Sequence, residues 1–240
     1  RPILIDMRKY IPLTLMLCLF AAVSCHKVNP RSEILLEEGW KFSLGDFETA
    51  FDPAFDDYQW DEVRIPHDWA IYGPFDRSND LQVREVKQND EIIVTERTGR
   101  TGGLPHVGTG WYRTKFDLRS FDKESHSVSL LFDGAMSGAQ VWVNGTKVIS
   151  WPSGYNSFHC DITQWLNEDG TNNFLAVRLE NPPSSSRWYP GAGIYRNVHL
   201  VKTKKIHIPI WGTYITTPEV SRKKAEVSLQ VAIEGSSDKD

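Results

Sequence analysis

Apolar and polar side chains alternate along most of the chain between Ile34 and Thr203, and turn residues interrupt this pattern every eight to twelve positions. A period of two places apolar side chains on one face of a β-strand, as in Val128, Leu130 and Phe132. The helical period of 3.6 is rare in this region. The pattern therefore predicts an all-β fold with two packed antiparallel sheets, a sandwich or jelly roll.

A β-hairpin is predicted where Val141 and Val143 alternate into Asn144-Gly145 and Val148 resumes the pattern. Asn-Gly suits the positive φ angles of a two-residue hairpin turn. Further strands are expected at 112–118, 174–180 and 197–202, and single helical turns at 161–166 and 56–63.

The segment 77–103 is a long, polar and charged excursion that ends in glycine. Residues 91–96 in it predict a β-hairpin because they combine β-branched side chains with charged neighbours. Insertions of this length are either functional loops or tolerated decoration. The sequence alone leaves both interpretations open.

A second domain is predicted to begin after Thr203, with strands at 206–210, 213–216 and 225–233. The segment 204–240 holds roughly 35 residues, whereas an independent β-sandwich takes about 100. We therefore expect it to be the truncated start of a domain in a longer polypeptide.

The N-terminal region has the pattern of an export signal. Met7-Arg8-Lys9 is a short basic start, and the apolar run 10–23 is too short to span a bilayer, which takes about 20 residues. Cys25 follows Ala22-Val23-Ser24 and resembles the acylated cysteine of a bacterial lipobox. Residues 1–25 are thus expected to be a misplaced translation start plus a lipoprotein-type signal peptide, and the protein an exported periplasmic or cell-surface lipoprotein whose one link to a membrane is this anchor.

The net charge, the spacing of the histidines and the absence of known catalytic motifs argue against several classes of function. A formal net charge of -4 gives no basic field for nucleic acid, so no nucleic-acid partner is expected. The seven histidines show no HxH or HExxH spacing, and no metal site is expected. No pair of carboxylates, nucleophile elbow or phosphate-binding loop is compelling, so we assign no catalytic residue.

The segment 186–198 is the strongest candidate for a ligand site, because it is aromatic, bent by glycines and followed by a strand. Arg187 and Trp188 could form one wall of a sugar site, since sugars pack their C–H faces on aromatic rings and hydrogen-bond through hydroxyls. A packing loop against a neighbouring domain fits the residues equally well. Asp68 is the most suggestive acidic residue, although a structural role, in which it caps a turn or binds backbone amides, is favoured.

Ordered blocks of the sequence resemble the N-terminal domain of family 2 glycoside hydrolases, especially exported bacterial β-galactosidases. Segment 186–198 is similar to the closing signature of that domain. The other blocks, in family order, are Pro66-His67-Asp68-Trp69, Gly110-Trp111-Tyr112-Arg113, 132–136, 141–145, Gly154-Tyr155, 158–163 and 173–177. His106, where glycine is commoner, and the excursion 77–103 depart from the family pattern.

The resemblance implies a sugar-binding jelly roll over 31–203, an immunoglobulin-like β-sandwich beginning at 204, and a catalytic (β/α)8 barrel outside this sequence. It implies substrate contacts, rather than catalysis, for Arg187, Trp188 and Asp68. No cofactor is implied within the chain, while Mg or Na assists some family members at sites outside this stretch. The expected partner is a β-galactoside or related carbohydrate.

Three interpretations remain open from sequence. The first is the front part of a retaining β-galactosidase, whose β-glucuronidase and β-mannosidase relatives share the architecture. The second is a non-catalytic carbohydrate-binding module, and the third is a surface structural protein. The oligomeric state is not readable from the residues.

Overall fold

The computed structural model describes residues 29–73, 75–76, 79, 81–98, 107–182 and 191–235. The chain divides into two compact units, Arg1–Pro30 and Arg31–Asp240, and the second unit contains all the strands described. Arg187, Trp188 and Cys25 lie outside the described residues. Within the described part, no helix has the length and apolar character needed to cross a membrane.

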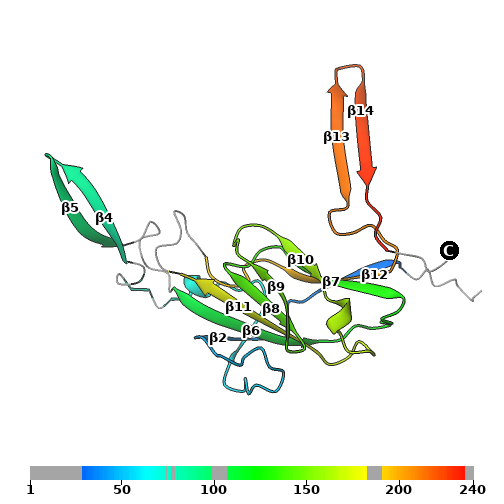
Figure 1. The fold of residues 1–240 in the computed structure, drawn as a ribbon, viewed down its shortest axis with the longest axis horizontal. Coiled ribbons are helices and arrows are strands. Elements are labelled where there is room, and N and C mark those ends of the chain that lie inside the picture. Colours follow the sequence, from blue (N-terminus) through cyan, green and yellow to red (C-terminus); the bar gives the residue numbers. More distant parts are fainter. Residues whose placement is uncertain are drawn as a thin grey trace, which may run out of the picture. The chain divides into compact units, whose positions relative to one another are not determined.

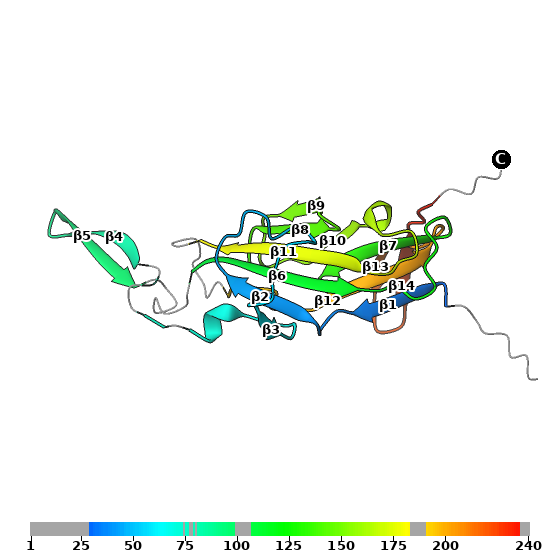
Figure 2. The ribbon, with the colours of Figure 1, turned by 90° about the horizontal axis from the view of Figure 1, so that it is seen from below.

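Two antiparallel sheets pack face to face and form a jelly-roll sandwich, as the alternation predicted (Figures 1 and 2). The first sheet has the order β1 (Arg31–Leu35), β12 (Val198–Lys204), β7 (His126–Phe132) and β10 (Phe158–Asp161). The second has the order β3 (Asp61–Val63), β2 (Trp40–Leu44), β6 (Gly108–Phe116), β11 (Asn173–Asn181), β8 (Ala139–Val143) and β9 (Thr146–Trp151).

The main core lies between the two sheets. Val128, Leu130 and Phe132 of β7 are fully buried there, as their alternation predicted. The Phe132 ring stacks on Phe158 of the neighbouring strand β10 at a centroid distance of 4.7 Å. From the second sheet, Tyr112 of β6 is fully buried in the same cluster. Close packing of such rings removes a large apolar area from water, which is the main favourable contribution to folding.

The predicted hairpin is confirmed by the pairing of β8 with β9. Asn144 and Gly145 form its turn with φ angles of 49° and 82°. The expected helical turn at 161–166 is present as a 3-10 helix, η3 (Thr163–Trp165). The helical turn expected at 56–63 is wrong, because Asp61–Val63 pairs with β2 as strand β3.

The excursion contains a long hairpin of β4 (Leu81–Gln88) and β5 (Glu91–Thr98). The hairpin predicted inside 91–96 is wrong, since all of those residues lie in β5. The turn is at Asn89-Asp90, with φ angles of 51° and 64°, which these residue types tolerate better than most. Strand β4 was not predicted from the sequence, because charged side chains interrupt its alternation of apolar residues.

A separate ribbon of β13 (Thr213–Val220) and β14 (Ala225–Val231) confirms two of the three strands predicted after Thr203. The strand predicted at 206–210 is wrong: His207 alone makes a bridge there, to Glu234. Pro209 has no N–H to donate to a ladder, which explains why the pairing does not extend.

A second apolar cluster covers the outer face of the six-stranded sheet. Trp111, Trp142 and Phe174 project from that face and pack against side chains of the connection 45–60 between β2 and β3. The connection has few backbone hydrogen bonds to the sheet, so its position depends on this packing and on one buried cation.

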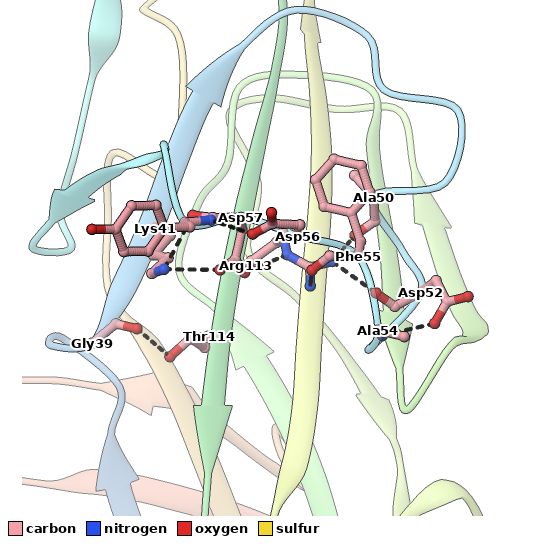
Figure 3. Close-up of polar contacts among 11 residues, drawn as sticks. Gly39, Lys41, Ala50, Asp52, Ala54, Phe55, Asp56, Asp57, Arg113 and Thr114 are labelled. Carbon is pink, nitrogen blue, oxygen red and sulfur yellow. Dashed lines mark hydrogen bonds and ion pairs between the residues drawn. The ribbon is translucent and has the colours of Figure 1, made fainter.

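That cation is Arg113 of β6, whose side chain is 2% exposed and binds the connection through its whole guanidinium group (Figure 3). Its Nε donates to Asp57 Oδ2 at 2.7 Å, and its other nitrogens donate to the carbonyl oxygens of Ala50, Asp52 and Phe55. Its Cζ also lies 4.3 Å from the centroid of the Phe174 ring. The guanidinium therefore fixes the path of residues 50–57 over the sheet.

The carboxylate of Asp57 is held in its charged form by two cations. Burial alone would raise its pKa, but the hydrogen bonds from Arg113 and Lys41 outweigh burial and lower the pKa below its usual value. Lys41 Nζ lies 2.8 Å from Asp57 Oδ1. A charged, paired Asp57 satisfies Arg113, which would otherwise be a costly isolated charge.

Replacing Arg113 by alanine should lower the free energy of unfolding by about 3 kcal/mol, because a partly buried carboxylate and three carbonyl groups lose their donor. Urea titration followed by tryptophan fluorescence measures the change. Lys147→Ala is the control, since Lys147 is exposed, lies over the Trp142 ring at 5.4 Å and donates one exposed hydrogen bond to Gln140 Oε1 at 2.6 Å. That variant should lose no more than about 1 kcal/mol. Equal losses in the two variants would contradict the role of Arg113.

Candidate functional site: the corner around Asp68

Asp68 lies at the start of a short 3-10 helix, η2 (Trp69–Ile71), which the sequence pattern did not predict. Its Oδ1 accepts a hydrogen bond from Ala70 N at 2.9 Å and caps this turn. The same oxygen accepts from Ala192 N, also at 2.9 Å. The structural role favoured for Asp68 is therefore present: its carboxylate joins the turn at 68–71 to a segment 124 residues further along the chain.

Two backbone hydrogen bonds also join residues 67–69 to residues 192–194, and these two segments form the junction around Asp68. His67 N donates to Ile194 O at 2.8 Å, and Trp69 N donates to Ala192 O at 2.9 Å. Ala192 follows Arg187 and Trp188 closely in the sequence. The structure thus brings Asp68 next to Ala192, while Arg187 and Trp188 themselves lie outside the described part of the chain.

Gly193 is required where these segments meet. Its φ is +122°, a region that side-chain-bearing residues rarely adopt. A Cβ atom there would overlap with the carbonyl oxygen of His67 and with the hydroxyl group of Tyr112. Gly193 also exchanges two backbone hydrogen bonds with Met136, at 2.9 and 3.0 Å. Three loops therefore converge at a position that tolerates only glycine.

The ring of His67 connects this junction to the core. Its Nδ1 lies 2.7 Å from the hydroxyl of Tyr112, which is fully buried. Burial lowers the pKa of His67, and the nearby charge of Asp61 only partly offsets this. Burial raises the pKa of Tyr112 well above its usual value. Both side chains are thus neutral at neutral pH and act as a hydrogen-bonded positioning pair.

Tyr72 completes the corner, since its ring stacks on His67 at a centroid distance of 5.8 Å and an interplanar angle of 20°. The Tyr72 side chain is otherwise exposed. The sequence analysis assigned no role to Tyr72; it named Tyr112 only within a family block and Gly193 only among the glycines that bend the segment 186–198. The Pro66-His67-Asp68-Trp69 motif pointed to the place, but the partners come from distant strands that the motif does not name.

Other candidate groups for catalysis are occupied. His199 lies between two carboxylates, with Nδ1 2.8 Å from Glu33 and Nε2 3.2 Å from Asp133, so neither ring nitrogen is open to a ligand. Burial, followed by the charge of Asp161, raises the pKa of the Cys160 thiol to about 12, so it is a poor nucleophile. Among the described residues, no three His, Cys, Asp or Glu side chains are grouped so as to bind a metal.

Most of the chain is similar in sequence and fold to known proteins. The family model described as "Glycosyl hydrolases family 2, sugar binding domain" matches residues 35–204. The β-galactosidase BoGH2A of Bacteroides ovatus is 38% identical over 91% of the chain, and a putative β-glucuronidase of Formosa agariphila is 33% identical over 85%. A crystal structure of a β-glycosidase from Bacteroides vulgatus superposes with a TM-score of 0.72 and 33% identity over 87% of the chain.

The chain is much shorter than these relatives. It spans 24% of the Bacteroides ovatus protein, 18% of the Formosa agariphila protein and 25% of the chain in the Bacteroides vulgatus structure. The similarity therefore concerns one region of larger proteins.

The stability of the chain should depend on the protonation of His67. Because burial lowers its pKa in the folded state, the unfolded chain binds the proton more readily, and stability is lost as the pH falls below the ordinary value of about 6.5. We expect the free energy of unfolding to fall between about pH 7 and about pH 5, and to fall less in His67→Gln. Urea titrations at several pH values measure the two slopes.

His126 contributes to the same slope in both proteins, since burial lowers its pKa too. A difference between the slopes therefore isolates His67. Identical slopes for the parent chain and His67→Gln would contradict the buried, neutral state of this ring.

Proposed function

Since the chain belongs to family 2 of the glycosyl hydrolases and contains the family's sugar-binding domain, we propose that it is the N-terminal part of an enzyme that hydrolyses β-galactosides. The observation that carries this proposal is the match over residues 35–204 together with 38% identity to a β-galactosidase. The longer polypeptide is called the parent enzyme below.

The catalytic groups belong to the part of the parent enzyme outside this sequence. Retaining hydrolysis needs two carboxyl groups about 5 to 5.5 Å apart, one as nucleophile and one as acid/base. The carboxylates with defined partners here serve the fold instead: Asp57 binds Arg113, Asp68 binds two backbone amides, and Asp46 binds Arg178. The catalytic pair is therefore proposed to lie in the part of the parent enzyme outside this sequence, and this domain is proposed to contribute sugar contacts.

The contribution of this domain is to shape the rim of the substrate site. Arg187 offers a fork of hydrogen-bond donors for sugar hydroxyls, and Trp188 offers an aromatic face for the C–H side of the sugar ring. Asp68 supports them, since its hydrogen bond to Ala192 holds the end of their loop. Binding energy from such remote contacts aids catalysis when it orients the bond to be broken.

The segment after Lys204 is proposed to start an immunoglobulin-like domain. Ile215 faces Leu229 across the β13–β14 ribbon, and these side chains are 62% and 59% exposed. Val227 and Val231 share that face and are also exposed. An isolated two-stranded ribbon is marginally stable in water, so further strands of the parent enzyme would cover this face.

Export and lipidation complete the proposal. The basic start at 7–9, the apolar run 10–23 and Cys25 support a lipoprotein signal peptide. The mature protein would then begin at Cys25 and be held at a membrane surface by acyl chains. Such a location suits an enzyme that acts on glycans outside the cytoplasm.

The parent enzyme should hydrolyse p-nitrophenyl β-galactoside with a kcat/KM at least about tenfold above that for p-nitrophenyl β-glucuronide, whereas the 240-residue chain should hydrolyse neither. Release of nitrophenol measures both. A preference for the glucuronide would replace the proposed substrate. Turnover by the 240-residue chain that a Glu or Asp substitution abolishes would contradict the placement of the catalytic carboxylates.

Lipidation is tested separately. Expressed in a Gram-negative host that is fed an alkyne-labelled fatty acid, the parent enzyme should incorporate the label, and Cys25→Ser should not, because the acylated thiol is lost. Cys160→Ser is the matched control and should keep the label. Equal labelling of the parent and Cys25→Ser would contradict the lipoprotein proposal.

A further inference from the structure

Three open hollows follow one another from the β2–β3 edge of the six-stranded sheet toward its strands β6 and β11. The first, of about 580 Å³, is lined by Pro66, His67 and Tyr72 at one side and by Glu37 and Arg64 at the other. The next two, of about 370 and 380 Å³, share lining residues with their neighbours: Val63, Arg64, Gly39 and Lys41. Each is within the usual range of small-ligand sites, about 300 to 1,000 Å³, and together they form one elongated groove.

An aromatic platform lies at one end of this groove. The Tyr72 side chain is 73% exposed, yet its ring is held from behind by stacking on His67. His67 is in turn fixed by the hydroxyl of buried Tyr112, at 2.7 Å. An exposed ring that is already held in place loses little conformational freedom on binding. This is a suitable surface for the C–H face of a sugar.

Polar groups line the rest of the groove in pairs. Arg64 Nε donates to Glu37 Oε2 at 2.9 Å, and Lys41 Nζ lies 2.8 Å from Asp57 Oδ1 at the far end (Figure 3). Such pairs present donors and acceptors side by side, which matches the hydroxyl groups of a sugar.

The charges of the groove balance. Its acidic side chains are Glu37, Glu38, Glu62 and Asp57, and its basic side chains are Arg64, Lys41, Arg113 and Lys115. With four of each, the formal charge is zero. A neutral ligand suits this surface better than a polyanion, which would meet unfavourable carboxylates along its length.

The edge strand itself argues against a protein partner. β3 has three residues, and two of them, Asp61 and Glu62, are exposed and charged. A very short, charged edge strand is a device that prevents pairing with another strand.

We infer that this edge carries a second glycan-binding site, a groove for a chain of several neutral β-linked sugar units, with Tyr72 as its stacking platform and Arg64 and Glu37 as its hydrogen-bonding groups. The groove is lined by residues other than Arg187, Trp188 and Asp68, and it begins at His67 and Tyr72 of the corner around Asp68. It would hold a polymer while the parent enzyme acts on chain ends.

The test is native electrophoresis of the 240-residue chain in gels that contain hydroxyethylcellulose, β-1,4-galactan or polygalacturonate. We expect retention by at least one neutral polymer and none by polygalacturonate. Calorimetric titration with oligosaccharides of that polymer should give an affinity that increases from one to several sugar units. Tyr72→Ala should weaken Kd about tenfold, the loss of one aromatic contact, and Arg64→Ala several-fold.

Tyr214→Ala is the matched control, because Tyr214 is similarly exposed, at 64%, but lies on the β13–β14 ribbon. It should bind as the parent chain does. No retention by either neutral polymer, or unchanged binding in Tyr72→Ala, would overturn the inference. So would elution as a dimer that Glu62→Pro converts to a monomer, since the edge would then serve a second copy of the chain.

The polymer-binding test can succeed or fail independently of the proposed hydrolysis of β-galactosides. In the parent enzyme, Arg64→Ala should leave kcat and KM for a small nitrophenyl galactoside unchanged while polymer retention is weakened, because Arg64 lines the groove and is not part of the corner around Asp68. A parent enzyme that hydrolyses no galactoside, together with a chain that still binds the neutral polymer, would refute the proposed function alone.

Discussion

Two neighbouring side chains on strand β6 hold the structures on both faces of the six-stranded sheet. Successive residues of a strand point to opposite faces, so Tyr112 enters the core between the sheets while Arg113 enters the outer apolar cluster. Tyr112 reaches the corner at His67 and Gly193, and Arg113 binds the connection 45–60. A shift of this strand by one residue would disrupt both attachments at once.

The surfaces that we propose to bind sugars depend on strand β6 through a short series of side-chain contacts. On the inner side, Tyr112 fixes His67, and the His67 ring supports the exposed ring of Tyr72. Beside them, Asp68 accepts a hydrogen bond from Ala192 N, and Ala192 follows Arg187 and Trp188 in the sequence. The aromatic ring of Tyr72 and the carboxylate of Asp68 are thus positioned by the sandwich, although both belong to the connection between β3 and β4. Binding residues commonly lie on loops that a rigid scaffold of strands or helices holds in position.

The sequence predicted the sandwich because alternation, turns and long strands such as β7 are local signals. It failed where tertiary contacts decide the structure. Residues 56–63 lack a helix because Asp61–Val63 pairs with β2, and β4 carries too many charged side chains to show an apolar pattern. At the site, the family motif pointed to Asp68. Its partner Ala192 is 124 residues away, and no local pattern could have named it.

The proposed contribution of this domain to the substrate site is tested most directly by comparing Trp188→Ala and Tyr214→Ala in the parent enzyme, assayed with a small nitrophenyl galactoside. We expect Trp188→Ala to lower kcat/KM about tenfold or more, because the substrate would lose an aromatic contact at the proposed rim, and we expect Tyr214→Ala to leave kcat/KM unchanged. An unchanged kcat/KM in Trp188→Ala, with the protein folded, would show that this domain does not contribute to the substrate site.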